Sequence, residues 1–199
     1  EERLQEARRK LQEQQLKVKE HGLPVLVLVE GWGTAGKGSL IGQIIKNIDP
    51  RFFKVASMAA PTEEEKRKPF LYRHFVKIPE SGKFSFLDSG WMDEIMGERL
   101  RFERQLTDNG YLVVKLFLQV SKKEQEKRIE HLSKEKDTRW RVSRNDRWQN
   151  EHYEKCLNAF DSYLKETNLP SAPWYIIDAE SKKWTELQVL EILTEGIDV

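Results

Sequence analysis

A run of five apolar residues followed by a glycine-rich turn constrains the fold of this chain more than any other feature. Residues 25–29 read Val-Leu-Val-Leu-Val, the pattern of a strand buried on both faces of a parallel sheet. Residues 31–39 fit G-x-x-x-x-G-K, and residues 40–45 then favour a helix. A strand, a glycine-rich turn and a helix N-terminus in this order predict a phosphate-binding loop.

The residues of this turn have the properties that phosphate binding requires. Glycines let the backbone curl so that N–H groups point at an anion, and Lys37 adds a mobile positive charge. The residue after this lysine is usually Ser or Thr, a magnesium ligand, but here it is Gly38. The alternative is a plain strand–helix turn with one exposed lysine. The candidate phosphate-binding residues are Gly31, Gly33, Thr34, Ala35, Gly36, Lys37, Gly38 and Ser39.

Composition narrows the class of protein. A chain of 199 residues suffices for one domain with a sheet covered on both faces. Its 34 Lys and Arg nearly balance 33 Asp and Glu, which gives no support for a nucleic-acid partner. No apolar run approaches membrane-spanning length, so no membrane partner is expected. Cys156 is the only cysteine and the start is not signal-like, which predicts a cytoplasmic protein. A first residue other than Met is compatible with a piece of a longer chain.

Periodicity and turn residues predict the other elements. We expect an N-terminal helix within 1–24 and a main domain at 25–199. Further strands are expected at 53–58, 83–88, 111–120 and 174–178. Helices are expected at 62–75 with a break at Pro69, at 91–109, from 121, from 145 or 146 to 166, and at 182–195. His74 is expected at the surface. Lys115 and Gln119, polar members of a central strand, are expected at the ends of the sheet or in a functional pocket.

Asp88 is the candidate metal ligand. A carboxylate at the C-terminal tip of a strand beside a phosphate loop can hold magnesium directly or through water. The alternative is that Asp88, Ser89 and Gly90 only end the strand and begin the next helix. The order of phosphate loop, then strand with Asp, is the order that phosphoryl transfer requires, and it favours the metal interpretation.

Residues 61–65, Pro-Thr-Glu-Glu-Glu, form a predicted helix start. Thr62 can cap it and Glu65 completes a capping box. Thr62, Glu63 and Glu64 also lie near the expected carboxyl end of a strand, where open α/β sheets bind substrates, and they are candidate nucleotide-binding residues. The alternative, glutamates that only match the helix dipole, is equally well supported.

Residues 122–150 form a strongly charged segment with interleaved tryptophans. Ser121 is expected to cap its first helix, with Glu124 three residues on. We interpret Arg128, Arg139 and Arg141 as arginines of a mobile lid that closes over phosphates and excludes water. The alternative is a solvated excursion of two helices, which composition alone does not exclude.

With these motifs, the chain resembles the polyphosphate kinase 2 family of P-loop phosphotransferases. The resemblance rests on the glycine-rich loop at 30–38, which begins with Glu-Gly and has glycine after its lysine. It also rests on the segments 60–65, 70–73, 86–88, 123–128, 140–146 and 172–179. It implies an α/β fold, a three-layer α/β/α sandwich of the P-loop nucleotide kinase type with a helical lid at about 122–150. It also implies Mg²⁺-dependent phosphoryl transfer between inorganic polyphosphate and a nucleotide such as AMP or ADP. Lys37, Asp88 and Arg128 would then be catalytic, and Arg73 would bind phosphate.

Two positions depart from the family pattern. The family usually has Gly-x-Asp at the start of the loop, the Asp helping to hold magnesium, where this chain has Gly33. The residue after the strand Asp is usually an arginine that contacts phosphate, where this chain has Ser89. Both changes weaken the electrostatic stabilisation on which phosphoryl transfer depends. A simple expectation is that Gly33→Asp and Ser89→Arg together raise activity.

These departures leave three hypotheses. The first is an active polyphosphate-dependent nucleotide kinase, and the second is a catalytically weak domain that binds polyphosphate or nucleotide. The third, an ATP-dependent nucleoside monophosphate kinase, does not explain the family-like lid. The family includes two-domain members with one divergent half, so a homo-oligomer or a part of a two-domain chain is expected.

Overall fold

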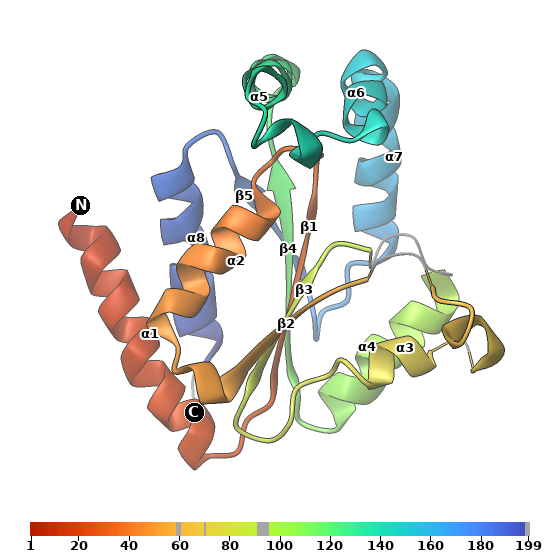
Figure 1. The fold of residues 1–199 in the computed structure, drawn as a ribbon. Coiled ribbons are helices and arrows are strands. Elements are labelled where there is room, and N and C mark those ends of the chain that lie inside the picture. Colours follow the sequence, from red (N-terminus) through yellow and green to blue (C-terminus); the bar gives the residue numbers. More distant parts are fainter. Residues whose placement is uncertain (59–60, 70, 91–95, 198–199) are drawn as a thin grey trace.

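The computed structural model describes residues 1–58, 61–69, 71–90 and 96–197, and a five-stranded parallel sheet forms its centre (Figure 1). The strands lie side by side in the order β2-β3-β1-β4-β5. Their bounds are Val25–Gly31 for β1, Phe53–Ser57 for β2, Phe84–Asp88 for β3, Leu112–Gln119 for β4 and Trp174–Asp178 for β5. All five strands occur where the sequence predicts them.

Helices cover both faces of the sheet, which confirms the three-layer α/β/α sandwich. One face carries α1 (Glu2–Glu20), α2 (Lys37–Ile44) and α8 (Lys182–Gly196), and the other carries α3 (Tyr72–Phe75), α4 (Met96–Asp108) and α7 (Tyr153–Glu166) (Figure 1). Above the carboxyl ends of the strands lie α5 (Lys122–Lys134) and α6 (Arg144–Glu151). Short 3-10 turns occur at Ile45–Asn47, Pro50–Phe52, Glu65–Arg67 and Arg139–Arg141. Among the described residues, no helix is both long and apolar enough to cross a membrane.

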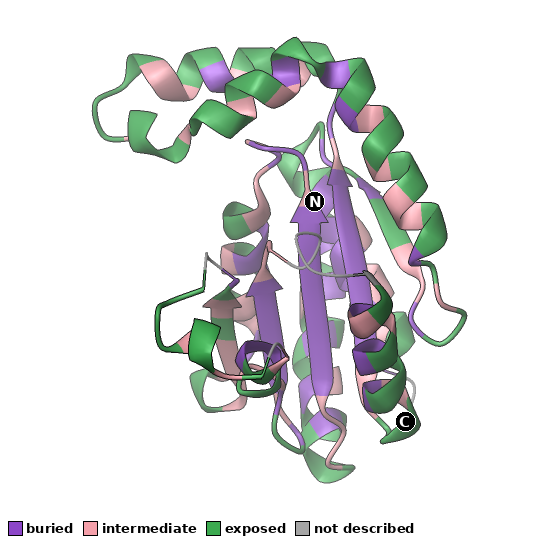
Figure 2. Cartoon of the chain, turned by 90° about the vertical axis from the view of Figure 1, so that its right-hand side faces the viewer, coloured by how far each residue is buried: buried purple, intermediate pink, exposed green. Residues whose placement is uncertain are grey.

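The central strand β1 has apolar side chains on both faces, so the sheet must be covered by helices on both sides. Its three valines pack in one cluster with residues of α1, α2 and α8. Leu26 and Leu28 point the other way and pack with Phe102 of α4. These five side chains of β1 are at most 1% exposed, and burying each stabilises the fold by about 1.5–3 kcal/mol. Figure 2 shows the resulting buried band along the middle strands.

The N-terminal helix α1 packs against the C-terminal helix α8. Its buried stripe contains Leu4, Ala7, Leu11 and Val18, which belong to the same core as the valines of β1. At the edge of this contact the guanidinium of Arg8 donates to both carboxylate oxygens of Glu186, at 2.7 and 2.9 Å. The first and last helices are therefore joined by packing and by a bidentate ion pair.

Lys115 lies fully buried in β4, and the expectation that it reaches the end of the sheet or a pocket is wrong. Its ammonium donates to Glu103 Oε2 and to the carbonyl oxygen of Thr167, each at 2.7 Å. It also lies 5.0 Å from the ring centroid of Trp174. Burial lowers the pKa of Lys115, and the carboxylate of Glu103 acts in the opposite direction. The pair joins β4 to α4 inside the structure.

The helix expected at 62–75, with a break at Pro69, is right about the break but too long. Among the described residues of this segment, helical structure is limited to the turn at Glu65–Arg67 and the short helix α3, and Lys68 between them is extended. Pro69 causes the break, because it lacks an N–H donor and disfavours helical geometry at the residue before it. The capping box at its start does form, since Thr62 N–H donates to Glu65 Oε2 at 2.9 Å and Glu65 N–H to Thr62 Oγ1 at 3.1 Å.

Two helices replace the single one expected from residue 145 or 146 to 166. Ser143 caps α6, and Asp146 at the third position closes a capping box, so neither Asn145 nor Asp146 is the cap. The chain leaves helical geometry at His152 and resumes as α7. Ser121 caps α5 as predicted. The first part of the helix expected at 91–109 falls on residues 91–95, outside the described residues.

His74 is 1% exposed, so its predicted surface position is wrong. It lies in α3 with its ring centroid 6.0 Å from that of Phe102. Desolvation, reinforced by the charges of Arg73 and Arg99, lowers the pKa of His74 to about 4. The imidazole is therefore neutral in the folded protein over a pH range in which an unfolded histidine is protonated.

The free energy of unfolding should fall as the pH drops from about 6.5 to about 4, by at most about 3 kcal/mol from His74 alone. The sign follows because the unfolded state binds more protons in this window. Denaturant titrations of the parent and of His74→Leu across the window measure it, and His74→Leu should remove this part of the pH dependence. His131→Leu, at an exposed position of α5, is the control. Parallel pH curves for the parent and His74→Leu would contradict the prediction.

Candidate active site

The carboxyl ends of β1 and β3 adjoin at the point where the winding of the sheet reverses. β1 leads through α2 to β2 on one side, and β3 leads through α4 to β4 on the other side. Open α/β sheets bind ligands in the crevice at such a switch point. The loop at 31–39 and Asp88 both lie there, so this end of the sheet is the candidate active site.

The loop turns directly into the N-terminus of α2. Gly36 is the N-cap residue, with φ at +96°, a left-handed conformation that glycine adopts without strain. The first N–H groups of α2 have no acceptor within the helix and carry its positive dipole end. The loop and helix start therefore have the form of an anion site, as the sequence predicts.

Lys37 folds back across the loop. Its ammonium donates to the carbonyl oxygens of two preceding loop residues, at 3.1 and 2.9 Å. Burial lowers the pKa of Lys37. Three carboxylates, those of Glu30, Asp88 and Asp146, act in the opposite direction because negative charge stabilises the ammonium. Lys37 thus lies in the field of three carboxylates, of which the sequence analysis identified only Asp88.

Asp88 ends β3 and faces the first turn of α2. Its Oδ2 lies 3.5 Å from the place that a β-carbon at Gly38 would take. Burial raises the pKa of Asp88, and the charge of Lys37 opposes this shift. Such a carboxylate suits a hard cation.

Asp88 can serve as a protein ligand of a magnesium ion that keeps its waters and also binds substrate phosphates. Within the described part of the chain, no group of three His, Cys, Asp or Glu residues could hold a metal ion. Magnesium usually keeps several waters and binds through one or two carboxylates together with substrate phosphates. Asp88 therefore fits as a ligand of Mg²⁺ that arrives with phosphate.

Trp32 anchors the loop to the protein, a role that the sequence analysis missed. Its ring is fully buried and stacks on Tyr153 of α7, with centroids 4.2 Å apart. Its Nε1–H donates to Gln119 Oε1 at 2.8 Å, and Gln119 donates to Tyr153 Oη at 2.9 Å. A tryptophan among small loop residues is the signal that could have indicated this, since so large a ring needs cover.

The lid helices α5 and α6 pack on the loop in this structure. Gln125 Nε2 of α5 donates to Gly33 O at 3.2 Å, and Gly33 N–H donates to Gln149 Oε1 of α6 at 2.9 Å. Asn150 Nδ2 donates to Gln125 Oε1 at 3.1 Å and so joins the two lid helices. Both backbone groups of Gly33 therefore bind the lid.

Arg128 joins the lid, the loop and the end of β5. Its NH1 donates to Ala35 O at 3.2 Å and its NH2 to Ala179 O at 2.7 Å. Its Nε donates to Glu124 Oε1 at 2.8 Å, within α5. The guanidinium is thus engaged by backbone carbonyls and one carboxylate, an arrangement that positions the lid.

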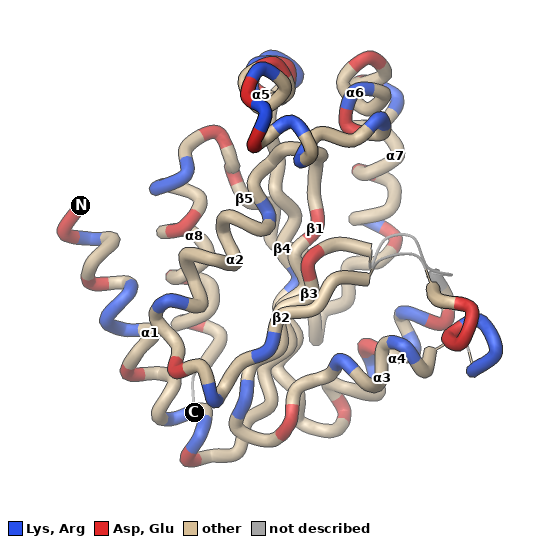
Figure 3. Tube along the Cα trace, in the orientation of Figure 1, with Lys and Arg blue, Asp and Glu red and all other residues tan. Residues whose placement is uncertain are grey.

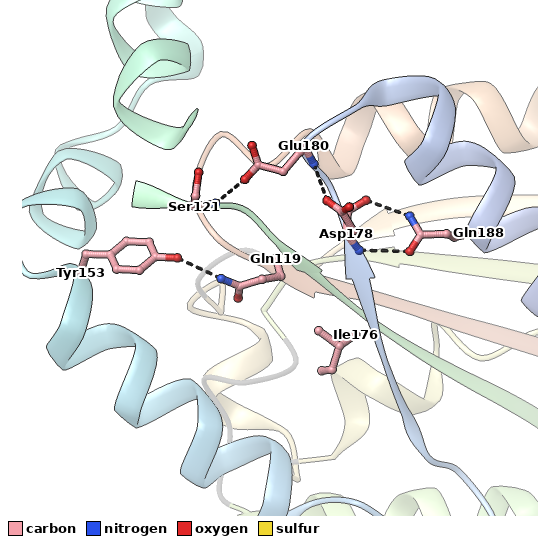
Figure 4. Close-up of a pocket in the computed structure, with 7 residues that line it drawn as sticks. All are labelled: Gln119, Ser121, Tyr153, Ile176, Asp178, Glu180 and Gln188. Atoms are coloured by element: carbon pink, nitrogen blue, oxygen red, sulfur yellow. Dashed lines mark hydrogen bonds between the residues drawn. The ribbon is translucent and has the colours of Figure 1, made fainter. Parts of the chain in front are cut away.

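A cavity of about 450 Å³ lies at the carboxyl ends of β4 and β5 (Figure 4). It is lined by Gln119, Ser121, Tyr153, Ile176, Asp178, Glu180 and Gln188. Glu180 Oε1 accepts from Ser121 N–H at 2.6 Å, and Asp178 Oδ1 accepts from Glu180 N–H at 3.0 Å. Two carboxylates in its wall disfavour a polyanion, so the glycine-rich loop is the better phosphate site.

Comparison with known proteins decides the family. The model of the polyphosphate kinase 2 family matches residues 1–199, the whole chain. The chain belongs to the polyphosphate kinase 2 family. This confirms the resemblance found in the sequence.

Individual members of the polyphosphate kinase 2 family are similar over most of this chain. A polyphosphate:AMP phosphotransferase of Pseudomonas syringae is 30% identical over 92% of this chain and 40% of the relative. An ADP-polyphosphate phosphotransferase of Rhizobium meliloti is 27% identical over 90% of this chain and 69% of that protein. A crystal structure of a putative polyphosphate kinase 2 from Pseudomonas aeruginosa superposes with a TM-score of 0.92 at 26% identity. This superposition covers 99% of the present chain but 46% of the Pseudomonas aeruginosa protein. The present chain thus spans less than half the length of some of its relatives.

Ser89, where the family usually has arginine, has a left-handed backbone with φ at +56°. Its N–H donates to Val29 O at 3.0 Å and its hydroxyl to the carbonyl oxygen of Asp88 at 2.8 Å. Ser89 therefore extends the contact between β1 and β3 beside the candidate metal ligand.

The other predicted site residues lie on the turn between the lid helices and on the connection after β2. Arg139 and Arg141 are exposed in the turn between α5 and α6, where Figure 3 shows basic and acidic residues mixed. Thr62, Glu63 and Glu64 are exposed on the connection that follows β2. Glu63 pairs with Lys66 at 2.6 Å and Glu64 with Lys68 at 2.7 Å. Arg73 is buried in α3.

Arg128→Ala should loosen the lid from the loop, because it removes donors to backbone carbonyls on two other segments. We expect the free energy of unfolding to fall by about 2–4 kcal/mol, since hydrogen bonds from a charged group contribute about 1.5–3 kcal/mol each and are not additive. Amide hydrogen exchange at 34–36 should become faster. Lys127→Ala, at an exposed neighbour, is the control. Unchanged stability and exchange with weakened polyphosphate binding would instead indicate the phosphate clamp that the sequence predicts.

Proposed function

We propose that this chain catalyses Mg²⁺-dependent phosphoryl transfer between inorganic polyphosphate and a nucleoside mono- or diphosphate such as AMP or ADP. The observation that carries the proposal is the placement of Lys37 and Asp88 at one anion-binding loop, at the switch point of the sheet. The names of the relatives, which mention polyphosphate with AMP or ADP, support the same reaction class.

In the proposed reaction, a terminal P–O bond of polyphosphate breaks as a new P–O bond forms to a terminal phosphate oxygen of the nucleotide. The reverse direction uses the same groups. Positioning and charge supply most of the catalysis in such transfers, and a strong general base is not required. The protein therefore has to orient two polyanions and compensate their charge.

Lys37 and Asp88 would compensate the charge of the phosphates in two different ways. The Lys37 ammonium would exchange its loop carbonyls for phosphoryl oxygens, which offer more negative charge. Asp88 would hold Mg²⁺, which when bound neutralises charge on the phosphates. Loop N–H groups and the start of α2 would bind the remaining oxygens.

The lid and the β2–β3 connection would bind the ends of the substrates. Exposed Arg139 and Arg141 can reach polyphosphate, while Arg128 keeps the lid in place. Thr62, Glu63 and Glu64 remain our candidates for the nucleotide, and Arg73 for phosphate. We also propose a cytoplasmic location, and assembly as a homo-oligomer or as part of a two-domain chain.

A second candidate function is a catalytically weak domain that binds polyphosphate or nucleotide. The lack of a carboxylate at Gly33 and of an arginine at Ser89 favours it. Incubating the purified chain with polyphosphate, Mg²⁺ and AMP or ADP, and measuring phosphorylated nucleotide, distinguishes the two. Binding of polyphosphate without any turnover would support the second function.

Lys37→Ala should reduce kcat/KM for nucleotide phosphorylation by about a hundredfold or more, the effect of removing a preorganised charge in a transfer reaction. The fold should survive, because the ammonium bonds only to carbonyls of its own loop. Lys46→Ala, an exposed lysine beyond the end of α2, is the control. Turnover equal to the parent's in Lys37→Ala would refute the assignment of the loop.

Replacing Arg139 and Arg141 by Ala should weaken polyphosphate binding and make it less dependent on salt. Polyphosphate is a dense polyanion, and each lost contact should reduce the slope of log affinity against log salt by about 0.7, as for single-stranded nucleic acids. Arg51→Ala, at an exposed site just before β2 and hence at the opposite end of the sheet, is the control. Titrations at several salt concentrations measure the slope, and an unchanged slope would exclude these arginines from the site.

A further inference from the structure

Gln119 is the last residue of β4, so it lies at the end of the sheet, as the sequence predicts. Its Oε1 accepts from the Nε1–H of Trp32 at 2.8 Å. Its Nε2 donates to Tyr153 Oη at 2.9 Å (Figure 4) and to Val120 O at 3.1 Å. The side-chain amide of Gln119 therefore connects the phosphate loop to α7.

The groups around this amide require one acceptor and one donor from position 119. The indole of Trp32 can only donate, and the Tyr153 hydroxyl already donates its proton to Val120 O at 2.6 Å. An amide has an acceptor on one atom and a donor on the other. A carboxylate could not donate, and an aliphatic side chain would leave a buried Nε1–H without an acceptor. The chemistry of glutamine thus matches its neighbours here.

Trp32 is fixed at its ring and at its backbone as well. The ring is fully buried, and it stacks on Tyr153 with an angle of 9° between the planes. It also meets Phe160 of α7 edge to face, with centroids 4.9 Å apart. The backbone N–H of Trp32 donates to Leu118 O of β4 at 3.2 Å. These contacts hold Trp32 against the end of β4 and against α7.

Trp32 begins the turn that shapes the phosphate loop. Its carbonyl oxygen accepts from Ala35 N–H at 3.2 Å, which closes a turn of four residues. Inside this turn Thr34 has a left-handed backbone, with φ at +59°. A β-branched residue keeps this strained conformation only where its surroundings enforce it. The chain then enters Gly36 and α2, so the position of Trp32 affects where the N–H groups of the anion site point.

We propose that Gln119 is a positioning residue of the phosphate loop. It fixes Trp32, and through Trp32 it keeps the strained turn at 32–35 in the form that binds phosphate before the substrate arrives. This inference rests on the proposed function and adds a residue that acts through Trp32 rather than on the phosphates. A loop without this support would have to be ordered during binding, which weakens the affinity for phosphate.

Four variants of the chain test the proposal: Gln119→Met, Trp32→Phe, the two combined, and the control Gln188→Met. Gln119→Met keeps the length of the side chain and removes its amide. Trp32→Phe keeps a ring over Tyr153 and removes the indole N–H. Gln188 is a matched control, because it is also half-buried and lines the same cavity. Its hydrogen bonds go to the backbone of Asp178 and of another α8 residue.

The measurements report the loop with and without turnover. Calorimetry gives the affinity for inorganic tripolyphosphate in the presence of Mg²⁺. Amide hydrogen exchange at 34–38 reports the order of the loop, and denaturant titration gives the free energy of unfolding of each variant. The kcat/KM for nucleotide phosphorylation is recorded in parallel.

We expect Gln119→Met to weaken tripolyphosphate binding by about tenfold and to speed exchange at 34–38, because a buried donor loses its acceptor. Trp32→Phe should act in the same direction but less strongly. The combined variant should bind within about twofold of Trp32→Phe alone, since no indole donor is then left unsatisfied. Gln188→Met should bind tripolyphosphate like the parent, even where its free energy of unfolding is lower.

Several results would overturn the proposal. One is parent-like affinity and loop exchange in Gln119→Met, and another is a combined variant in which the two losses multiply. Equal weakening by Gln188→Met would indicate a general loss of stability instead, and a parent that binds no tripolyphosphate has no loop to position. If Gln119→Met does not fold, Trp32→Phe breaks the same hydrogen bond from the loop side, and parent-like binding and exchange there decide against the proposal.

The binding measurement separates this inference from the proposed function. If affinity and exchange change as expected but no variant and no parent phosphorylates a nucleotide, the positioning role stands and the proposed activity fails. If the parent is active and Gln119→Met has the parent's kcat/KM, affinity and loop exchange, the activity stands and the positioning role fails.

Discussion

A phosphate loop turns its N–H groups toward an anion, and this leaves its carbonyl oxygens to be satisfied from elsewhere. Buried carbonyls without partners are costly, so each needs a donor. In this chain Lys37 donates to the first two carbonyls, those of Gly31 and Trp32, and Gln125 to the next, that of Gly33. Arg128 donates to the following two, and the N–H of Leu40 to the carbonyl of Gly36. Donors from α2 and from the lid helix α5 thus hold the loop from behind, and its shape depends on both.

Because α5 supplies part of these donors, the lid is connected to the folded core as well as to the phosphate loop. Arg128 spans the loop and the end of β5, and Trp32 ties the loop to α7 by stacking on Tyr153. A movement of α5 away from the loop would therefore remove donors from the loop carbonyls. Lys37 has the opposite role, because its loop carbonyls are weaker partners than ionised phosphates. With the lid packed, α5 therefore holds the loop carbonyls, while Lys37 would exchange its own two carbonyls for substrate phosphates.

Local patterns predicted the fold well and the contacts of the site poorly. The apolar strands, the cap at Ser121 and the carboxylate at Asp88 depend on neighbours in the sequence, and each was found. The break at Pro69 was predicted as well, because proline lacks the N–H donor, but the helical parts on its two sides are shorter than expected. The roles of Gly33 and Arg128 depend on residues far away in the chain, up to 116 positions for the bond from Gly33 to Gln149. No spacing rule contains such a pair, so the loop could be recognised while its supports could not.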